Sequence, residues 1–441
     1  MELSCCTYKT TGTEYASQKW AHCYDCFSSD EEGACEYCLE TCHSGHKIGP
    51  QREGLFFCDC GEQSMCDSNA NPVKIPSKIP SKIPSKIPSE IICKNFPNVV
   101  TNLAIKLGNV LDSNSVYSPL SIAYVLSILQ LGSGGNTYKE LTQLLGLSIL
   151  DVQLFAINKL FNSNVVKLAN AIMVNKNIPL GSAYLHTARK LALVSNEDFS
   201  KKSLVVSKAN SFIETNTNGL IKDILKEDNI DSDSLMIIIN TLYFKTTWRD
   251  PFSKKSTVND MFNDKIPVLM MTNTKNYSYF EDKIVQIVEF PYVGNNFCMG
   301  FILPKKFNLD NCYEYLNNLD DLSSTKVNVR IPKFTQRKNM DLVTPLKKLG
   351  LKDIFSPKSK LDKMFSNSEI EAYVSKIIHE AVVIVDEEGT EAAAVTAAIV
   401  CKNSCRRPSP PKKFNANHSF IYYIKYYPTN TLLFVGDYHA V

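Results

Sequence analysis

The chain has 441 residues, of which 44% are hydrophobic, and its formal net charge at pH 7 is only +3. This length supports one large core and a smaller second unit, and the small net charge gives no case for nucleic-acid binding. No apolar run reaches the ~20 residues that a membrane helix needs, and residues 1–6 lack the pattern of a secretory signal. We therefore expect a cytoplasmic or nucleocytoplasmic protein without nucleic-acid or membrane partners, acting in a host cell if its source is a virus.

The cysteines are concentrated near the start of the chain, where eleven of the 15 lie between Cys5 and Cys93. A disulfide framework needs an oxidising compartment, and the lack of a visible signal argues against one. Residues 1–68 also carry few aliphatic side chains, so a unit of this size needs a staple to fold. The cysteine distribution therefore predicts a small metal-stabilised unit.

Within residues 1–68, Cys and His residues come in closely spaced pairs. The candidate ligands are Cys6, Cys23, Cys26, Cys35, Cys38, His43, His46, Cys58, Cys60 and Cys66. This spacing lets one turn of the chain present two ligands to a tetrahedral Zn²⁺ ion. A redox role is disfavoured, because a CxxC redox pair usually follows a βα unit. Structural zinc is the predicted cofactor.

Residues 69–90 hold four tandem copies of Lys-Ile-Pro-Ser, from Lys74 to Ser89. A proline at every fourth position removes backbone donors and fixes φ, so neither a helix nor a sheet can continue through the segment. We predict an extended linker with four positive charges. A recognition tract for a partner or for modifying enzymes is the alternative.

Residues 91–441 have the composition of a globular domain. Apolar residues at helical spacing predict a helix over 98–109, and Ser118-Pro119 predicts the start of a second helix over 121–131. A continuous β-branched run predicts a buried strand over 236–244. Further strands are predicted over 297–303, 327–331, 382–385, 420–423 and 432–435. Helices come before most of the strands, which indicates an α+β fold with large sheets.

The ligand order in residues 1–68 resembles the UBR box, the zinc finger by which N-recognin ubiquitin ligases bind destabilising N-termini. The resemblance rests most on Cys58-Asp59-Cys60-Gly61 and on Cys42-His43-Ser44-Gly45-His46. It implies three zinc ions held by the ten ligands above, two of the ions sharing a cysteine. It also implies that Asp30, Asp59 and Glu62 bind an N-degron, although Glu62 stands where many members carry Asp. N-degron proteins or ubiquitin-ligase components are then the expected partners, and a purely structural finger is the alternative.

The larger segment is similar to the serpin family of protease inhibitors. The motifs that carry the resemblance lie at residues 114–122, 131–137, 169–171, 217–221, 240–245, 289–292, 331–334, 379 and 434–436. Membership implies an α+β fold of three β-sheets and about nine helices with an exposed reactive loop over residues 387–413. It also implies a monomer that forms a covalent complex with a target endopeptidase. His379 matches a structural histidine of this family.

The start of the predicted reactive loop has the composition of a hinge: Glu387, Glu388, Gly389, Thr390, Glu391, Ala392, Ala393 and Ala394. A serpin loop that a protease has cleaved inserts as a new central strand, so residues that enter the sheet must be small. Alternate positions from Thr390 to Ala398 are small and uncharged, and Gly389 gives backbone freedom. Helix formation by the alanines is the alternative, and the preceding β-branched strand disfavours it. The hinge therefore favours active inhibition.

The scissile bond is not fixed by the sequence. Counting forward from Gly389 by the family spacing places it at Asn403-Ser404, with Lys402 as a one-residue alternative. Counting back from Phe414 places it at Arg406-Arg407. Asn403 indicates an asparagine-specific protease, whereas Lys402 or Arg406 indicates a trypsin-like enzyme with an acidic pocket. Cys401 and Cys405 bracket the site, either as free thiols or as a redox-sensitive disulfide.

Two functional hypotheses follow from these patterns. The first is a suicide-type inhibitor of a serine or cysteine endopeptidase, carrying a zinc recognition module. The second is a non-inhibitory adaptor that binds N-degrons or ubiquitin-ligase machinery through the finger. No catalytic residues and no Ser-His-Asp arrangement are predicted, so the chain is not expected to be an enzyme.

Overall fold

The computed structural model describes residues 16–24, 34–35, 38–39, 47–56, 89–146, 165–231, 233–367, 370–390 and 410–440. Its contacts divide the chain into two units, Met1–Pro84 and Ser85–Val441. Each unit contains sheets of its own.

The smaller unit contains a three-stranded antiparallel sheet. Strand β1 (Ala16–Ala21) lies between β2 (Ala34–Cys35) and β3 (Arg52–Phe56). Cys35 pairs with Trp20 across the β1–β2 ladder, which places a cysteine opposite an aromatic residue in the sheet.

Three of the ten candidate zinc ligands lie in the described part of the smaller unit. Cys23, Cys35 and Cys38 are fully buried there. The other seven ligands, and the candidate degron-binding residues Asp30, Asp59 and Glu62, lie outside the described residues. Among the residues that are described, no three metal-ligating side chains converge. The zinc site therefore stays a prediction.

The larger unit begins with helices. The α-helices among its described residues are α4 (Ser89–Gly108), α5 (Pro119–Gly132), α6 (Gly135–Leu145), α8 (Ser182–Ala188), α9 (Lys202–Asn216) and α10 (Val343–Lys348). Short 3-10 helices lie at Glu227–Asn229, Lys254–Ser256, Cys312–Asn317, Asp353–Phe355 and Tyr427–Thr429. Helix α5 begins as predicted: Ser118 is its N-cap, and the Ser118 side chain accepts a hydrogen bond from the backbone N–H of Ser121.

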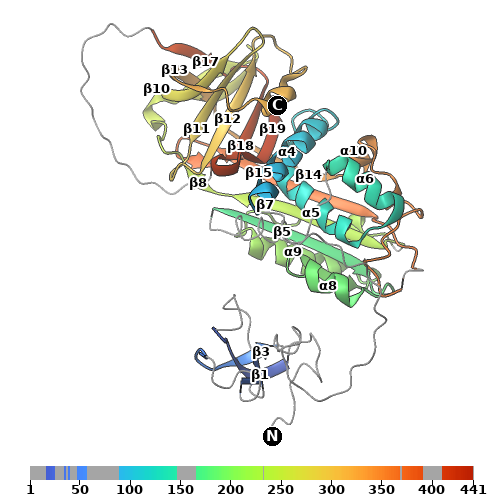
Figure 1. Cartoon of the computed structure of the whole chain (residues 1–441). Coiled ribbons are helices and arrows are strands. Elements are labelled where there is room, and N and C mark those ends of the chain that lie inside the picture. The colour runs from blue at the N-terminus through green and yellow to red at the C-terminus, as the bar shows by residue number, and fades with distance from the viewer. Residues whose placement is uncertain are drawn as a thin grey trace. The chain divides into compact units, whose positions relative to one another are not determined.

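A five-stranded sheet forms the centre of this unit. Its order is β14 (Phe334–Asp341), β15 (Lys376–Val385), β7 (Met236–Phe244), β5 (Val166–Asn175) and β6 (Leu193–Glu197). All nine residues of β7 are buried, because helices cover both faces of the sheet. In β7, Ile238 and Leu242 pack with α5 residues in one apolar cluster, whereas Ile237 and Ile239 pack with α9 in the other. Figure 1 shows α5 and α9 on opposite sides of these strands.

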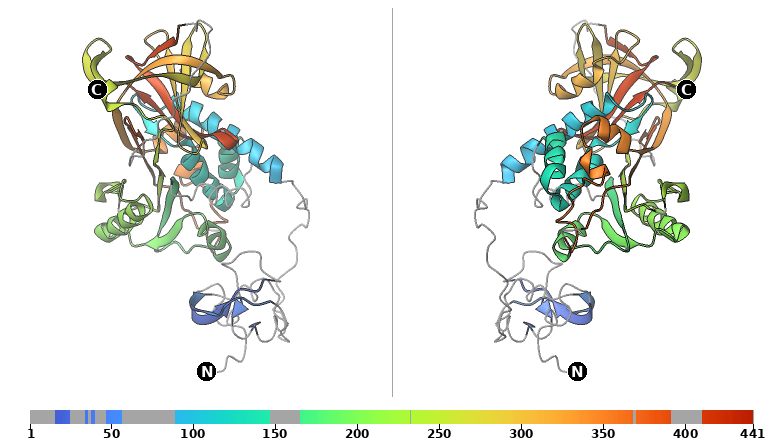
Figure 2. Two further views of the ribbon diagram at one scale, coloured as in Figure 1. Left: turned by 90° about the vertical axis from the view of Figure 1, so that its left-hand side faces the viewer. Right: turned by 90° about the vertical axis from the view of Figure 1, so that its right-hand side faces the viewer.

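A nine-stranded sheet lies at the end of this unit away from α8 and α9 (Figures 1 and 2). Its main path runs through β17 (Lys412–Asn415), β13 (Ser323–Pro332), β10 (Ile266–Glu281), β11 (Val285–Pro291), β12 (Phe297–Pro304), β18 (Phe420–Tyr426), β19 (Thr431–Tyr438) and β4 (Val116–Tyr117). Strand β9 (Val258–Phe262) pairs with β10 beside this path. Strands β8 (Thr246–Thr247) and β16 (Gly389–Thr390) form a separate pair, which joins the segment after β7 to the predicted hinge.

Candidate functional site

The central sheet is open at one end between β7 and β15. These two parallel strands pair only from Lys376–Ile237 to Glu380–Thr241. Beyond that point β7 stays paired with β5 as far as Phe244, and β15 stays paired with β14 as far as Val385. Within the described strands, residues 381–385 of β15 therefore have a partner strand on one side only. The β7–β15 ladder is therefore incomplete at the end from which the chain leaves β15.

The chain leaves β15 through a tight turn. Asp386 accepts hydrogen bonds at its Oδ1 atom from the backbone N–H groups of Glu388 and Gly389, at 2.8 Å and 3.0 Å. Gly389 has φ of 155°, and a Cβ atom there would lie 2.5 Å from the carbonyl oxygen of Thr246. Only glycine therefore fits this turn and the close approach to β8.

An aromatic pair holds the hinge in place. The Trp248 indole N–H donates to the carbonyl oxygen of Asp386, and the Trp248 backbone N–H donates to that of Glu388, both at 2.9 Å. Trp248 stacks on Tyr292 at a centroid distance of 4.5 Å. The Tyr292 hydroxyl lies 2.6 Å from Thr390 Oγ1, and both side chains are buried. Residues 386–390 are thus attached to the top of the sheet but are not part of it.

A buried carboxylate lies at the same place. Glu387 is 4% exposed, and its carboxylate contacts the Lys333 ammonium at 2.6 Å and accepts a hydrogen bond from the Thr257 hydroxyl at 2.8 Å. Burial alone would raise the pKa of Glu387, but the hydrogen bonds from Lys333 and Thr257 lower it below its usual value. The hinge therefore carries a negative charge. This charge is stabilised by Lys333, the residue between β13 and β14.

A buried polar network crosses the central sheet below the opening. His379 of β15 and Asn240 of β7 face each other in the ladder, and the His379 Nδ1 atom lies 2.7 Å from Asn240 Oδ1. The Ser118 backbone N–H donates to His379 Nε2, at 3.0 Å, so Nδ1 carries the proton and donates to Asn240. Asn240 in turn donates to the Asn170 side chain of β5. This network joins the two strands that would have to separate for another strand to enter.

Comparison with known proteins agrees with this geometry. The family model described as serpin (serine protease inhibitor) matches residues 99–440. A serpin-like protein of Acanthamoeba polyphaga mimivirus is 38% identical over 348 residues, covering 74% of this chain and 85% of the relative. The chain belongs to the serpin family. The pig (Sus scrofa) leukocyte elastase inhibitor is 31% identical over 352 residues, covering 73% of this chain and 92% of the inhibitor.

Solved serpin structures share the fold of the larger unit. The native stressed conformation of the Arabidopsis serpin AtSerpin1 matches with a TM-score of 0.67 and 28% identity, covering 78% of this chain and 97% of that structure. Native protease nexin-1, solved with heparin, matches with a TM-score of 0.70 and 26% identity, covering 79% of this chain and 99% of that structure. The predicted serpin fold is therefore confirmed for the larger unit, and the chain is a member of a family of protease inhibitors.

The described residues include the first part of the predicted hinge, and the loop that follows lies outside them. Glu387, Glu388, Gly389 and Thr390 come together with Trp248 as described above. The remaining predicted positions lie outside the described residues: Glu391, Ala392, Ala393, Ala394, Cys401, Lys402, Asn403, Ser404, Cys405, Arg406 and Arg407. The partners of the hinge were not predicted from sequence. Thr257 lies in none of the serpin motifs. Lys333 lies in the motif at residues 331–334, but that motif does not predict a contact with Glu387.

One expectation is corrected by the structure. Ser419, His439 and Asp437 do contact one another: Ser419 Oγ lies 3.0 Å from His439 Nδ1, and His439 Nε2 lies 2.7 Å from Asp437 Oδ2. Ser419 precedes Phe420 and His439 follows Tyr438, and Phe420 and Tyr438 are paired at the ends of two adjacent antiparallel strands. Asp437 also accepts the backbone N–H groups of residues 114 and 115. The three side chains therefore tie the end of the sheet to the turn before β4, which is a structural role.

The contact between Lys333 and Glu387 gives a test of the hinge anchor. Replacing Lys333 by methionine leaves a buried carboxylate without its cation, and we expect the free energy of unfolding to fall by about 1–3 kcal/mol. The double substitution Lys333→Met with Glu387→Gln removes the charge as well and should recover part of this loss. Urea denaturation of the wild type, both single variants and the double variant measures the coupling. Equal losses in the single and double variants would contradict an ionic anchor.

Proposed function

We propose that this serpin is a suicide-type inhibitor of a serine or cysteine endopeptidase. The observation that carries the proposal is the opening between β7 and β15, which leads directly into a glycine-containing hinge with small side chains after it. A strand that turns back from β15 runs antiparallel to both β15 and β7. It would gain hydrogen bonds on both sides, each worth on the order of 1 kcal/mol.

The inhibitory step follows from this arrangement. The nucleophile of the target protease attacks the carbonyl carbon of the scissile residue, the peptide bond breaks, and the new amino terminus leaves. The protease is then joined to the loop by an ester or thioester bond. Insertion of residues 390–398 between β7 and β15 carries the bound protease away from the hinge and distorts its active site before water can hydrolyse the bond.

The target class rests on the residue at the scissile bond. Asn403-Ser404 is the proposed bond, because the length between hinge and bond sets how far the protease is carried. Cleavage after Asn403 fits an asparagine-specific cysteine protease, whereas cleavage after Lys402 or Arg406 fits a trypsin-like or proprotein-processing enzyme.

Incubation with asparaginyl, trypsin-like and subtilisin-like proteases tests the proposal. We expect a complex that survives boiling in detergent with one of these enzymes, and N-terminal sequencing of the released fragment then identifies the scissile bond. Cleavage of the loop by every enzyme without such a complex would favour the non-inhibitory adaptor instead.

We also propose that residues 1–68 bind three structural zinc ions through the ten predicted ligands. Cys23, Cys35 and Cys38 support this, because a described part whose other fully buried apolar side chains are Ala21 and Ala34 places three thiols in its interior. Metal ligation would supply the folding free energy that so small a core lacks.

Metal analysis of the purified full chain checks the zinc proposal. We expect about three zinc ions per chain by mass spectrometry of the metal content, in line with the predicted ligand set. A strong chelator should release them and unfold the small unit, while the thermal transition of the serpin unit stays where it was. A chain that carries no zinc and whose melting is unchanged by chelator would contradict the proposal.

The partner of the finger is proposed to be an N-degron, bound by Asp30, Asp59 and Glu62. Carboxylates suit the α-amino group and a basic first side chain. Calorimetry of the full chain with peptides that begin with Arg or with Phe, against the same peptides acetylated at the N-terminus, separates degron binding from a purely structural finger.

The cytoplasm or nucleocytoplasm is the proposed compartment. No helix among the described residues is long and apolar enough to cross a membrane.

A further inference from the structure

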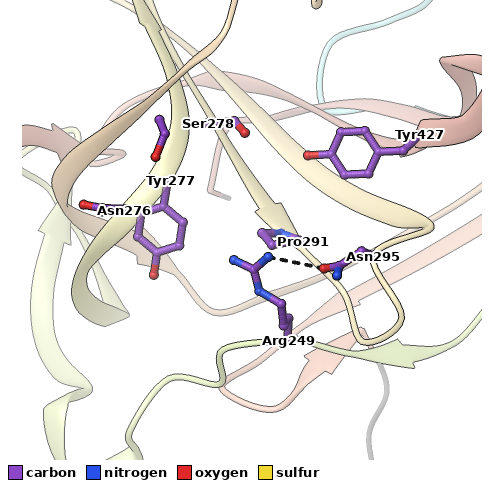
Figure 3. A pocket seen from close by; sticks show the side chains of 8 residues that line it. Arg249, Asn276, Tyr277, Ser278, Pro291, Asn295 and Tyr427 are labelled. Carbon is purple, nitrogen blue, oxygen red and sulfur yellow. Dashed lines mark hydrogen bonds between the residues drawn. The ribbon is translucent and has the colours of Figure 1, made fainter. Parts of the chain in front are cut away.

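A cavity of about 300 Å³ lies beside Arg249, the residue that follows Trp248. It lies where the residue after Trp248, the middle of β10 and the turn between β11 and β12 meet. Its polar lining comes from Arg249, Asn276, Tyr277, Ser278, Asn295 and Ser324. Figure 3 shows the Arg249 guanidinium group between Tyr277 and Asn295. No carboxylate is among the lining residues, so the cavity offers mainly hydrogen-bond donors.

Tyr277 contributes a hydroxyl group that the protein does not use. The side chain is 3% exposed, and its hydroxyl has no hydrogen-bond partner among the described residues. Burial raises the pKa of Tyr277 well above its usual value, so the group stays protonated and can donate. An unpaired buried hydroxyl costs free energy, and a ligand that accepts its hydrogen bond removes this cost. The other tyrosine of the lining, Tyr427, already donates to the Glu289 carboxylate at 2.8 Å.

Arg249 gives the cavity a positive charge that its neighbours do not neutralise. Its Nε atom donates to Asp250 at 3.0 Å, and one terminal nitrogen donates to Asn295 at 3.3 Å. Asp250 is shared, because the Lys275 ammonium contacts its other oxygen at 2.6 Å. Two cations thus face one carboxylate. Across the cavity, the Glu289 carboxylate is matched by the buried Lys425 ammonium at 2.8 Å. The local balance is one positive charge.

Two serine residues also line the cavity, on the face of β10 opposite to Tyr277. Ser278 of β10 and Ser324 of β13 are paired residues in the antiparallel ladder, so their side chains lie next to each other on one face. Pro291 and the ring of Tyr427 form the less polar wall. A guanidinium group with hydroxyl and amide donors around it is suited to the planar oxygens of a carboxylate or the oxygens of a phosphate.

We propose that this cavity is a binding site for a small molecule that carries a carboxylate or phosphate group. The oxyanion would lie against Arg249 and take the free hydrogen bond of Tyr277. A volume of about 300 Å³ is at the lower end of small-molecule sites, which limits the ligand to a small one. The site is separate from the proposed inhibitory function, because none of its lining residues belongs to β7, β15 or the hinge.

Calorimetry of the full, uncleaved chain with inorganic phosphate and with citrate, at matched ionic strength, tests the site. We expect at least one of the two to bind with a dissociation constant below about 1 mM, and phosphate against citrate tells the two oxyanion classes apart. Arg249→Gln should weaken binding about tenfold or more, because it removes the charge of the site. The matched control Arg189→Gln removes the same charge from an exposed position elsewhere and should leave binding unchanged.

Tyr277→Phe is the sharper variant, because it removes only a hydroxyl that has no partner in the protein. We expect binding to weaken about tenfold while the melting temperature stays the same or rises, a pattern that general damage to the fold would not give. Failure of both phosphate and citrate to bind would overturn the proposal and leave the cavity as a water-filled depression. Binding that Tyr277→Phe and Arg249→Gln leave unchanged would also overturn it. Neither result depends on whether the chain inhibits a protease.

Discussion

Replacing Thr390 by arginine is expected to turn this serpin from an inhibitor into a substrate. Thr390 is 2% exposed. In the proposed mechanism it is the first residue of the hinge whose side chain enters the sheet. A guanidinium group carried into that interior loses its hydration without gaining a partner, which costs several kcal/mol and slows insertion. Each 1.36 kcal/mol added to the barrier slows the step tenfold, so hydrolysis of the acyl-enzyme overtakes insertion.

The measurement is the number of serpin molecules consumed for each protease molecule inactivated. We expect this ratio to rise about tenfold or more in Thr390→Arg, with cleaved chain replacing the detergent-stable complex. Thr390→Val is the matched control: it keeps the branched shape and loses only the contact with the Tyr292 hydroxyl, so it should still inhibit. Equal amounts of complex from wild type and Thr390→Arg would show that insertion of the hinge is not the inhibitory step.

Local sequence patterns predicted the elements whose character depends on their own residues. The strand predicted over 236–244 is β7 with the same bounds, because an unbroken apolar run is needed where helices cover both faces of a sheet. The first helix was less well predicted. It starts at Ser89 and continues through Pro97, whereas the predicted helix began only after that proline. A single proline removes one backbone hydrogen bond, and the packed remainder of α4 tolerates the loss.

The sequence predicted the hinge residues of the site but not the residues that bind the hinge to the rest of the fold. Gly389 was expected from the need for backbone freedom, and its φ of 155° together with the closeness of Thr246 gives the reason. The contacts of Glu387 with Lys333 and Thr257 join residues that are far apart in the sequence, and no local pattern encodes such pairs. The cavity beside Arg249 is of the same kind, since five separate segments supply its walls.

The specificity for a target protease cannot be predicted from the fold. The structure fixes where β15 ends and where β17 resumes at Lys412, and both ends are properties of the scaffold. In the proposed mechanism, the residues at the scissile bond have to fit the pocket of the target protease, and the fold of this chain does not determine that pocket. The sheet itself therefore does not decide between two scissile bonds that differ by three residues, and the preference for Asn403-Ser404 rests on the length of the loop after the hinge.

His379 should make the stability of the serpin unit fall in acid. Burial lowers the pKa of His379 from 6.5 to about 3, and its Nε2 atom already accepts a hydrogen bond from the Ser118 backbone. Because the folded pKa lies below the unfolded one, the unfolded chain takes up the proton first. The contribution of His379 to stability is therefore fully present above pH 6.5 and is lost as the pH falls toward 3. Between pH 7 and pH 5 the loss is about 2 kcal/mol.

The same side chain is part of the contact between β15 and β7, so loss of its network weakens the junction that insertion has to open. Urea denaturation of wild type and His379→Gln at pH 7 and pH 5 isolates its effect. The glutamine variant should be less stable at pH 7, and the difference from wild type should shrink by about 2 kcal/mol at pH 5, because glutamine does not titrate. His186→Gln, at a histidine outside the network, should keep the pH dependence of the wild type. A difference between wild type and His379→Gln that does not change with pH would show that His379 is not held neutral by its burial.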